Sequence, residues 1–141
     1  MADRRTFSIS LVTPEGAVFD DEAEMIIVPG AAGEIGVLAR HAPLIAMLNA
    51  GSTRVYTDVD NEQVQEFATG PGFFSVEQDR ALALVNTAVN VREIDPDAAH
   101  AQLEEAQAEL ERIERGESEA DRWQVEQRIK AAENELAAAG R

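Results

Sequence analysis

The sequence predicts an N-terminal antiparallel β-sandwich followed by a C-terminal antiparallel hairpin of two helices. In residues 1–90, apolar residues alternate with period two and turn residues recur every ~8–12 residues. In residues 91–141 the apolar spacing changes to three and four, as in helices. The composition changes at the same point, because the second segment lacks Phe and Tyr and is rich in Ala, Glu, Gln and Arg. We therefore predict a sandwich domain at 1–90 and a helical hairpin at 91–141.

The first strand is predicted where Phe7, Ile9 and Leu11 alternate with polar residues. Pro14 and Gly16 then supply the residue types of a turn. The other strand-like segments are residues 17–19, 25–28, 55–59, 64–67, 73–76 and 81–85. The pair at 55–59 and 64–67 forms a hairpin around a turn at 60–62. Short strands between frequent turns are typical of an all-β sandwich or barrel and not of a parallel sheet with crossover helices.

Two helices are predicted in the second segment, at about 96–115 and 119–139. Asp95 is the expected N-cap of the first, with Pro96 at its first position, where the missing N–H costs nothing. Gly116 ends that helix, and a connection this short makes the two helices antiparallel.

The start of the second helix is predicted from Ser118-Glu119-Ala120-Asp121, which has the pattern of a capping box with Asp in place of Glu. Apolar side chains spaced by three and four form a narrow seam on each helix, which is typical of helices that pack on each other. These seams are Ala99, Leu103, Ala106, Leu110 and Ile113, and then Val125, Ile129, Ala132 and Leu136.

The composition excludes several functions. The 141 residues include 12 Lys+Arg and 27 Asp+Glu, for a net charge of −15, which argues against nucleic acid and anionic lipid as partners. The absence of Cys excludes disulfides, thiol catalysis and zinc–thiolate sites. There is neither an apolar run of ~18 residues nor a signal-peptide region, so we expect an intracellular chain without direct bilayer insertion.

No catalytic residue and no metal site are expected. His41 and His100 are the only histidines, and they lie in different parts of the chain. No hydroxyl nucleophile has a recognisable catalytic neighbour. The acidic run at 20–24 lacks the spacing of a calcium loop and is expected on an edge strand, where charges oppose aggregation.

A glycine-rich segment at 30–36 has some features of a phosphate loop. It lacks the closing Lys-Ser/Thr, and Glu34 would repel a phosphate. We therefore predict that Gly30, Gly33 and Gly36 form a tight bend between strands, and we expect no cofactor.

Residues 33–44, GEIGVLARHAPL, closely resemble the G-x-x-G-V-L-x-x-H-A-P-L stretch of the ε subunits of F-type ATP synthases. Residues 6–18 resemble the opening strand of that family with its T-P-E-G turn. Residues 69–76 resemble its G-G-F-x-x-V strand, with Pro71 where a glycine is more usual. The resemblance extends over essentially the whole chain and includes its division into a sandwich and a helical hairpin.

The resemblance implies a non-catalytic rotor subunit in the central stalk of a proton-translocating F-type ATP synthase. Such a subunit is peripheral, at the cytoplasmic face of the cell (inner) membrane. Its sandwich would pack on the γ subunit and rest on the polar loops of the membrane c-ring. By the same resemblance, Arg40, His41, Ala42 and Pro43 would lie nearest the c-ring, and the glycine bend would shape the sandwich end beside them.

The hairpin resembles the regulatory element of this family, which folds against the sandwich or extends along γ into the catalytic head and there inhibits ATP hydrolysis. The candidates for contact with acidic surfaces of the β (and α) subunits are Arg112, Arg115, Arg122, Arg128 and Lys130. Residues 91–141 nevertheless carry 7 basic and 14 acidic side chains, which opposes strong electrostatic docking.

Some family members bind ATP through an I-D-x-x-R-A motif on this hairpin. The matching residues here are Ile94, Asp95, Ala98 and Ala99, with Ala98 in the place of the arginine. Without that guanidinium the phosphates lose their main local partner, so ATP binding is expected to be weak or absent.

Two other functions are compatible with the residues alone. The first is a free-standing β-sandwich adaptor with a helical interaction arm, which co-purification with γ and c subunits would separate from the rotor interpretation. The second is a small enzyme or ligand-binding sandwich, which the lack of a catalytic constellation disfavours.

Overall fold

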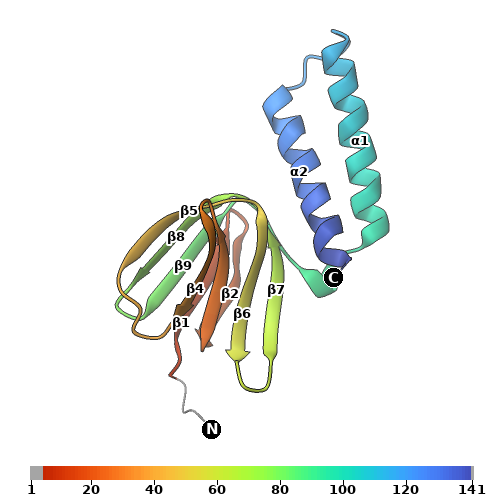
Figure 1. The fold of residues 1–141 in the computed structure, drawn as a ribbon. Coiled ribbons are helices and arrows are strands. Elements are labelled where there is room, and N and C mark those ends of the chain that lie inside the picture. The colour runs from red at the N-terminus through yellow and green to blue at the C-terminus, as the bar shows by residue number, and fades with distance from the viewer. Residues whose placement is uncertain (1–4, 141) are drawn as a thin grey trace. The chain divides into compact units, whose positions relative to one another are not determined.

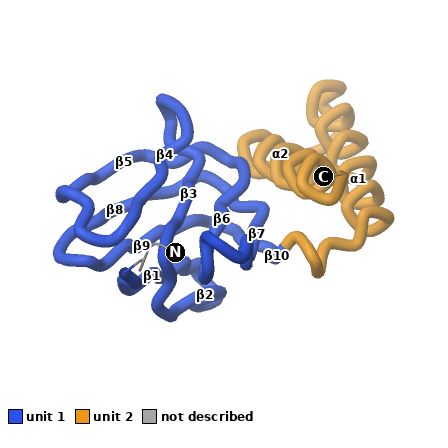
Figure 2. Tube along the Cα trace, turned by 60° about the horizontal axis from the view of Figure 1, so that its bottom comes forward, with its two compact units in different colours: residues 1–90 blue, residues 91–141 orange. Residues whose placement is uncertain are grey.

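The computed structural model describes residues 5–140, which form two compact units divided between Asn90 and Val91 (Figures 1 and 2). The first unit is a β-sandwich and the second contains two helices, so the predicted fold class is confirmed. The strands are β1 (Phe7–Thr13), β2 (Gly16–Ala23), β3 (Met25–Gly30), β4 (Gly33–Leu38), β5 (Leu44–Leu48), β6 (Gly51–Asp58), β7 (Gln63–Thr69), β8 (Gly72–Glu77), β9 (Arg80–Val85) and β10 (Ala88–Asn90).

The strands pair in the order β10-β7-β6-β3-β5-β8-β9-β1-β2, and β4 pairs with β3 outside this path. Neighbouring strands are antiparallel, with the exception of the parallel pair β1–β9. The parallel pair brings the first strand beside the ninth, whereas β10 and β2 lie at the two ends of the order.

The sandwich core follows the alternation in the sequence. Phe7, Ile9 and Leu11 of β1 are buried, as period two requires for a strand with one face on the core. The same alternation buries Phe74 and Val76 of β8. The hydroxyls of Thr53 and Thr69 lie 2.9 Å apart inside the sandwich, so each buried hydroxyl has a hydrogen-bonding partner.

The second unit contains a 3-10 turn at Val91–Glu93 and two antiparallel helices, α1 (Pro96–Glu114) and α2 (Arg122–Ala139) (Figure 1). Asp95 caps α1, because its carboxylate accepts hydrogen bonds from the N–H groups of Asp97 and Ala98 at 3.0 and 3.4 Å. The buried residues of the helices are Ala99 and Ala106 on α1 and Val125, Ala132 and Ala138 on α2.

The second helix begins three residues later than predicted. Asp121 is its N-cap and accepts hydrogen bonds from the N–H groups of Trp123 and Gln124 at 2.9 and 3.4 Å. The Ser118 hydroxyl instead donates to the Glu109 carboxylate of α1 at 2.7 Å. A carboxylate is both a strong N-cap and a favourable charge at a helix N-terminus, so Asp121 takes the position that the capping-box pattern gave to Ser118.

We predict that Gly72→Ala destabilises the sandwich by about 2–4 kcal/mol, because the added methyl group would clash with backbone atoms that cannot move aside. A Cβ built at Gly72 would lie 1.9 Å from the carbonyl oxygen of Leu84, a backbone atom in the neighbouring strand. The matched control is Gly36→Ala, whose Cβ would meet only a side-chain carbon of Ile27 at 3.9 Å. Urea unfolding of both variants measures the difference, and equal stabilities would contradict this reading of the contact.

Candidate functional site

The loop that joins β4 to β5 is anchored by Asp79, a residue of the turn between β8 and β9. The N–H of Arg40, a residue with φ +65°, donates to the Asp79 carboxylate at 2.5 Å. The carbonyl of Asp79 accepts from the N–H of Ser8 on β1 at 3.1 Å. One acidic residue thus holds three segments together at this end of the sandwich, and nothing in the local sequence of the loop indicates it.

Within this loop, the side chain of His41 contacts its own chain. Its Nδ1–H donates to the carbonyl of Ala42 at 2.7 Å, and the residue is half-buried. Arg40, Ala42 and Pro43 are exposed. The loop therefore offers a partner a guanidinium and a compact Ala-Pro corner, with the imidazole partly covered.

The glycine bend lies at the opposite end of β4, which corrects the expectation that it lies beside the Arg40 loop. β3 and β4 pair from Met25↔Leu38 to Gly30↔Gly33, so the turn consists of Ala31 and Ala32. Gly33 has φ +134°, a conformation that favours glycine. Gly36 lies inside β4 opposite Ile27 and is not part of the turn. At ~3.3 Å per residue, β4 separates the bend from the loop by about 17 Å.

A second surface, which was not among the predicted sites, covers the outer face of β5, β8 and β9. We call it the apolar face, and its members are Ile45, Met47, Phe73, Leu82 and Leu84. Met47, Phe73 and Leu84 are register partners across the three strands, and Ile45 and Leu82 flank Ser75 in the next row. Ile45 is 77% exposed and Met47 57%, so large apolar side chains remain in water.

The sequence of these strands does carry a signal for the apolar face. In the segments LIAML and ALALV, apolar residues occupy the outward positions as well as the inward ones. A strand that needs only one buried face normally carries polar residues at the outward positions. Apolar residues at both sets of positions were therefore the available signal for a surface that another protein covers.

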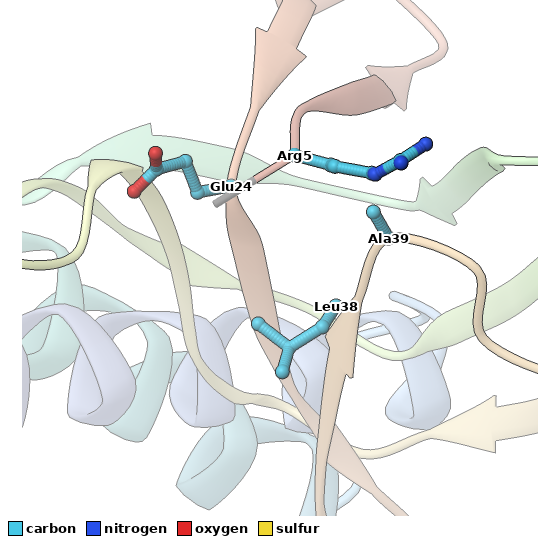
Figure 3. Close-up of a pocket in the computed structure, with 4 residues that line it drawn as sticks. All are labelled: Arg5, Glu24, Leu38 and Ala39. Atoms are coloured by element: carbon cyan, nitrogen blue, oxygen red, sulfur yellow. The ribbon is translucent and has the colours of Figure 1, made fainter. Parts of the chain in front are cut away.

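A small pocket near the Arg40 loop lacks the features of a ligand site. It measures about 200 Å³ and is lined by Arg5, Glu24, Leu38 and Ala39 (Figure 3). The guanidinium of Arg5 and the carboxylate of Glu24 point away from each other. Glu24 is also engaged, since it accepts from the N–H of Val59 at 2.8 Å. The charged groups do not converge on a common ligand position.

The five basic residues predicted to contact acidic surfaces are mostly paired inside the hairpin. The ion pairs are Arg112–Glu109, Arg115–Glu111 at 3.8 Å, Arg122–Glu114 at 3.1 Å, Arg122–Glu126 at 3.0 Å and Arg128–Glu105 at 3.8 Å. The pairs of Arg122 with Glu114 and of Arg128 with Glu105 join the two helices. Lys130 forms no ion pair within residues 5–140.

The hydrogen bonds of the hairpin also affect its carboxylates. The hydroxyl of Ser118, and after it the guanidinium of Arg112, lower the pKa of Glu109 below its ordinary value. Burial raises the pKa of Glu135 on α2.

The four residues that match the ATP motif lie at the start of α1. Asp95 serves as its cap, Ala98 is exposed and Ala99 is buried, while Ile94 is half-buried in front of the cap. The Asp95 carboxylate already accepts two backbone N–H groups, so it has a structural role at this position.

In the part of the chain that the structure describes, no group of three or more His, Cys, Asp or Glu side chains could hold a metal ion. Neither described helix combines the length and the apolar character needed to cross a membrane.

Comparison with known proteins agrees with the sandwich and the chain layout. The family model described as ATP synthase, Delta/Epsilon chain, beta-sandwich domain matches residues 6–91. The ATP synthase epsilon chain of Gloeothece citriformis (strain PCC 7424) is 38% identical over 135 residues, which is 96% of both chains. That of Desulfitobacterium hafniense (strain Y51) is 41% identical over 105 residues, 74% of this chain and 77% of the relative.

Two solved structures share the fold. A chain of the Euglena gracilis mitochondrial ATP synthase matches with a TM-score of 0.72 and 24% identity, covering 98% of this chain and 86% of that one. A chain of the Tetrahymena thermophila mitochondrial ATP synthase matches with a TM-score of 0.57 and 11% identity. Since the family model covers the sandwich and a relative matches along almost the entire sequence, the chain belongs to the ATP synthase epsilon subunit family.

Proposed function

We propose that this chain is the central-stalk ε subunit that couples the γ subunit to the c-ring in a proton-translocating F-type ATP synthase. It would do so as a peripheral, non-catalytic subunit at the cytoplasmic face of the cell membrane. The observation that carries the proposal is the apolar face of β5, β8 and β9. Family membership indicates the kind of assembly to which the chain belongs. The apolar face is an exposed surface that a partner subunit would cover.

The apolar face has the character of a protein interface. Its side chains lie in register on three neighbouring strands and form one continuous surface. Clusters of this kind on a folded protein mark contact sites, and aromatic and Met side chains are enriched in interfaces. Burying each such side chain contributes ~1.5–3 kcal/mol. We propose that the γ subunit covers this face.

We predict that Leu84→Ser weakens binding to the γ subunit about tenfold or more, because it removes one buried apolar side chain from the interface. The matched control is Leu38→Ser, since Leu38 of β4 is equally exposed, 46% for each residue, and lies outside the apolar face. Titration of immobilised γ with each variant measures the dissociation constants. Equal dissociation constants for the two variants would contradict the proposal that γ binds this face.

We further propose that the Arg40–Pro43 loop lies against the polar loops of the c-ring. The family resemblance and the exposure of Arg40, Ala42 and Pro43 support this assignment, as does the anchoring of the loop by Asp79. A loop that is already ordered loses little entropy on binding. Because the glycine bend lies at the other end of β4, the loop and the bend would not face the same side of a partner.

Two single-cysteine variants distinguish these ends, because the chain contains no Cys of its own. We predict that a photoactivatable cross-linker on Ala42→Cys forms adducts with subunit c in the assembled synthase, whereas the same label on Ala32→Cys does not. Both alanines are exposed, so labelling itself is matched. Adducts from Ala32→Cys alone would show that the bend, and not the loop, contacts the c-ring.

For the hairpin we propose a regulatory role. Its contact with the catalytic head would depend on the fit of the helices more than on ion pairs. Four of its five candidate basic side chains are already paired with acidic residues of the same hairpin. Contact with an acidic β-subunit surface would therefore exchange one set of ion pairs for another, and exposed pairs of this kind contribute only ~0–1 kcal/mol.

We predict that deletion of residues 96–141 raises the ATP hydrolysis rate of the assembled complex by a factor of about two or more, because a half-populated inhibited state already halves the rate. In the double variant Arg122→Gln/Arg128→Gln the rate should change less than in the deletion. Hydrolysis and proton pumping are measured together. An unchanged rate with intact coupling in the deletion variant would exclude an inhibitory hairpin.

A further inference from the structure

The outer face of β5, β8, β9 and β1 changes from apolar to polar along the strands. The row Met47–Phe73–Leu84 is apolar. Two rows further along, Glu77 pairs with Arg80 and Arg80 with Ser8, so every position is polar. Ser75, Leu82 and Ser10 form the row between them, which belongs to both halves. The polar end therefore continues the apolar rows along the same strands.

The polar end contains a depression of about 410 Å³. The polar residues that line it are Ser8, Ser10, Asp20, Ser75, Glu77 and Arg80. Leu82 also lines it, and Leu82 is a member of the apolar face. The depression and the apolar face are thus one continuous surface.

The charges of this depression favour a cation. The depression is lined by two acidic residues, Asp20 and Glu77, and one basic residue, Arg80. The Ser10 hydroxyl donates to the Asp20 carboxylate at 2.9 Å. The hydroxyls of Ser8 and Ser75 add acceptor oxygens, which an ammonium or guanidinium can use. Hydrogen bonds between such cations and carboxylates are shorter and stronger than neutral ones.

We infer that the γ subunit places a basic side chain, Lys or Arg, in the depression formed by Ser10, Asp20, Ser75 and Glu77 when it covers the apolar face. This inference rests on the proposed function, because it assumes that γ is the partner. The apolar rows supply most of the buried area, and the charge contact selects one position of the partner along the strands. A partner shifted by one row would bury Asp20 and Glu77 against apolar groups, which is costly.

The test is the binding of full-length chain to purified γ at low and at high salt. Asp20→Asn/Glu77→Gln should weaken binding about tenfold at low salt, and less at high salt, because salt screens the lost attraction. Arg80→Gln should strengthen binding about threefold, since it removes a like charge beside the incoming cation. The matched control is Asp21→Asn, which removes the same charge on the same strand one position along, where β2 presents its other side.

An affinity of Asp20→Asn/Glu77→Gln within about twofold of the unmodified chain would overturn the inference. An equal loss in Asp21→Asn would also overturn it, because the effect would then reflect net charge alone. Weaker binding in Arg80→Gln would show that the partner group is acidic. These results leave the proposed function intact when Leu84→Ser still weakens binding. If the unmodified chain fails to bind γ, the proposed function itself fails.

Discussion

Burial of alternate side chains along β1, β8 and β9 is the constraint on which the rest of the sandwich depends. Ile9, Leu11, Phe74 and Ala83 are fully buried, so each strand has one permitted register, and a slip by one residue would turn its core side chains into water. In this register β1 pairs in parallel with β9, from Ser8↔Arg80 to Val12↔Leu84. The same register aligns the outward side chains of β5, β8 and β9 into rows, and those rows form the apolar face.

The two ends of the sandwich are stabilised differently. At one end, Asp79 joins the Arg40 loop to β1 through backbone hydrogen bonds on its carboxylate and its carbonyl. At the other, the bend is held by backbone bonds to β5, from the Ala31 N–H to Met47 and from the Asn49 N–H to Pro29, both at 2.9 Å. Both ends are thus held by hydrogen bonds to backbone groups and not by large buried side chains.

Sequence patterns predicted most of the strands, both helices and the family, but β5 and β10 had no predicted counterpart. The details of the site depended on distant residues. The GEIGVLARHAPL segment identified the family, and Asp95 and Pro96 located the start of α1 correctly. The bend between two strands was predicted correctly at Gly30 and Gly33, but Gly36 belongs to a paired strand, and pairing with β3 is invisible in the local sequence. The start of α2 was wrong because two acceptors, Ser118 and Asp121, compete for one cap.

By itself, the sequence determined the division into a strand-rich and a helical part, the acidity and the family, because local periodicity and composition carry that information. The tertiary structure alone decided which outward side chains meet, since rows such as Met47–Phe73–Leu84 join residues far apart in the chain. It also decided that most of the hairpin's arginines are paired with acidic residues of the same hairpin. Such contacts depend on register and packing, and no residue pattern within one segment encodes them.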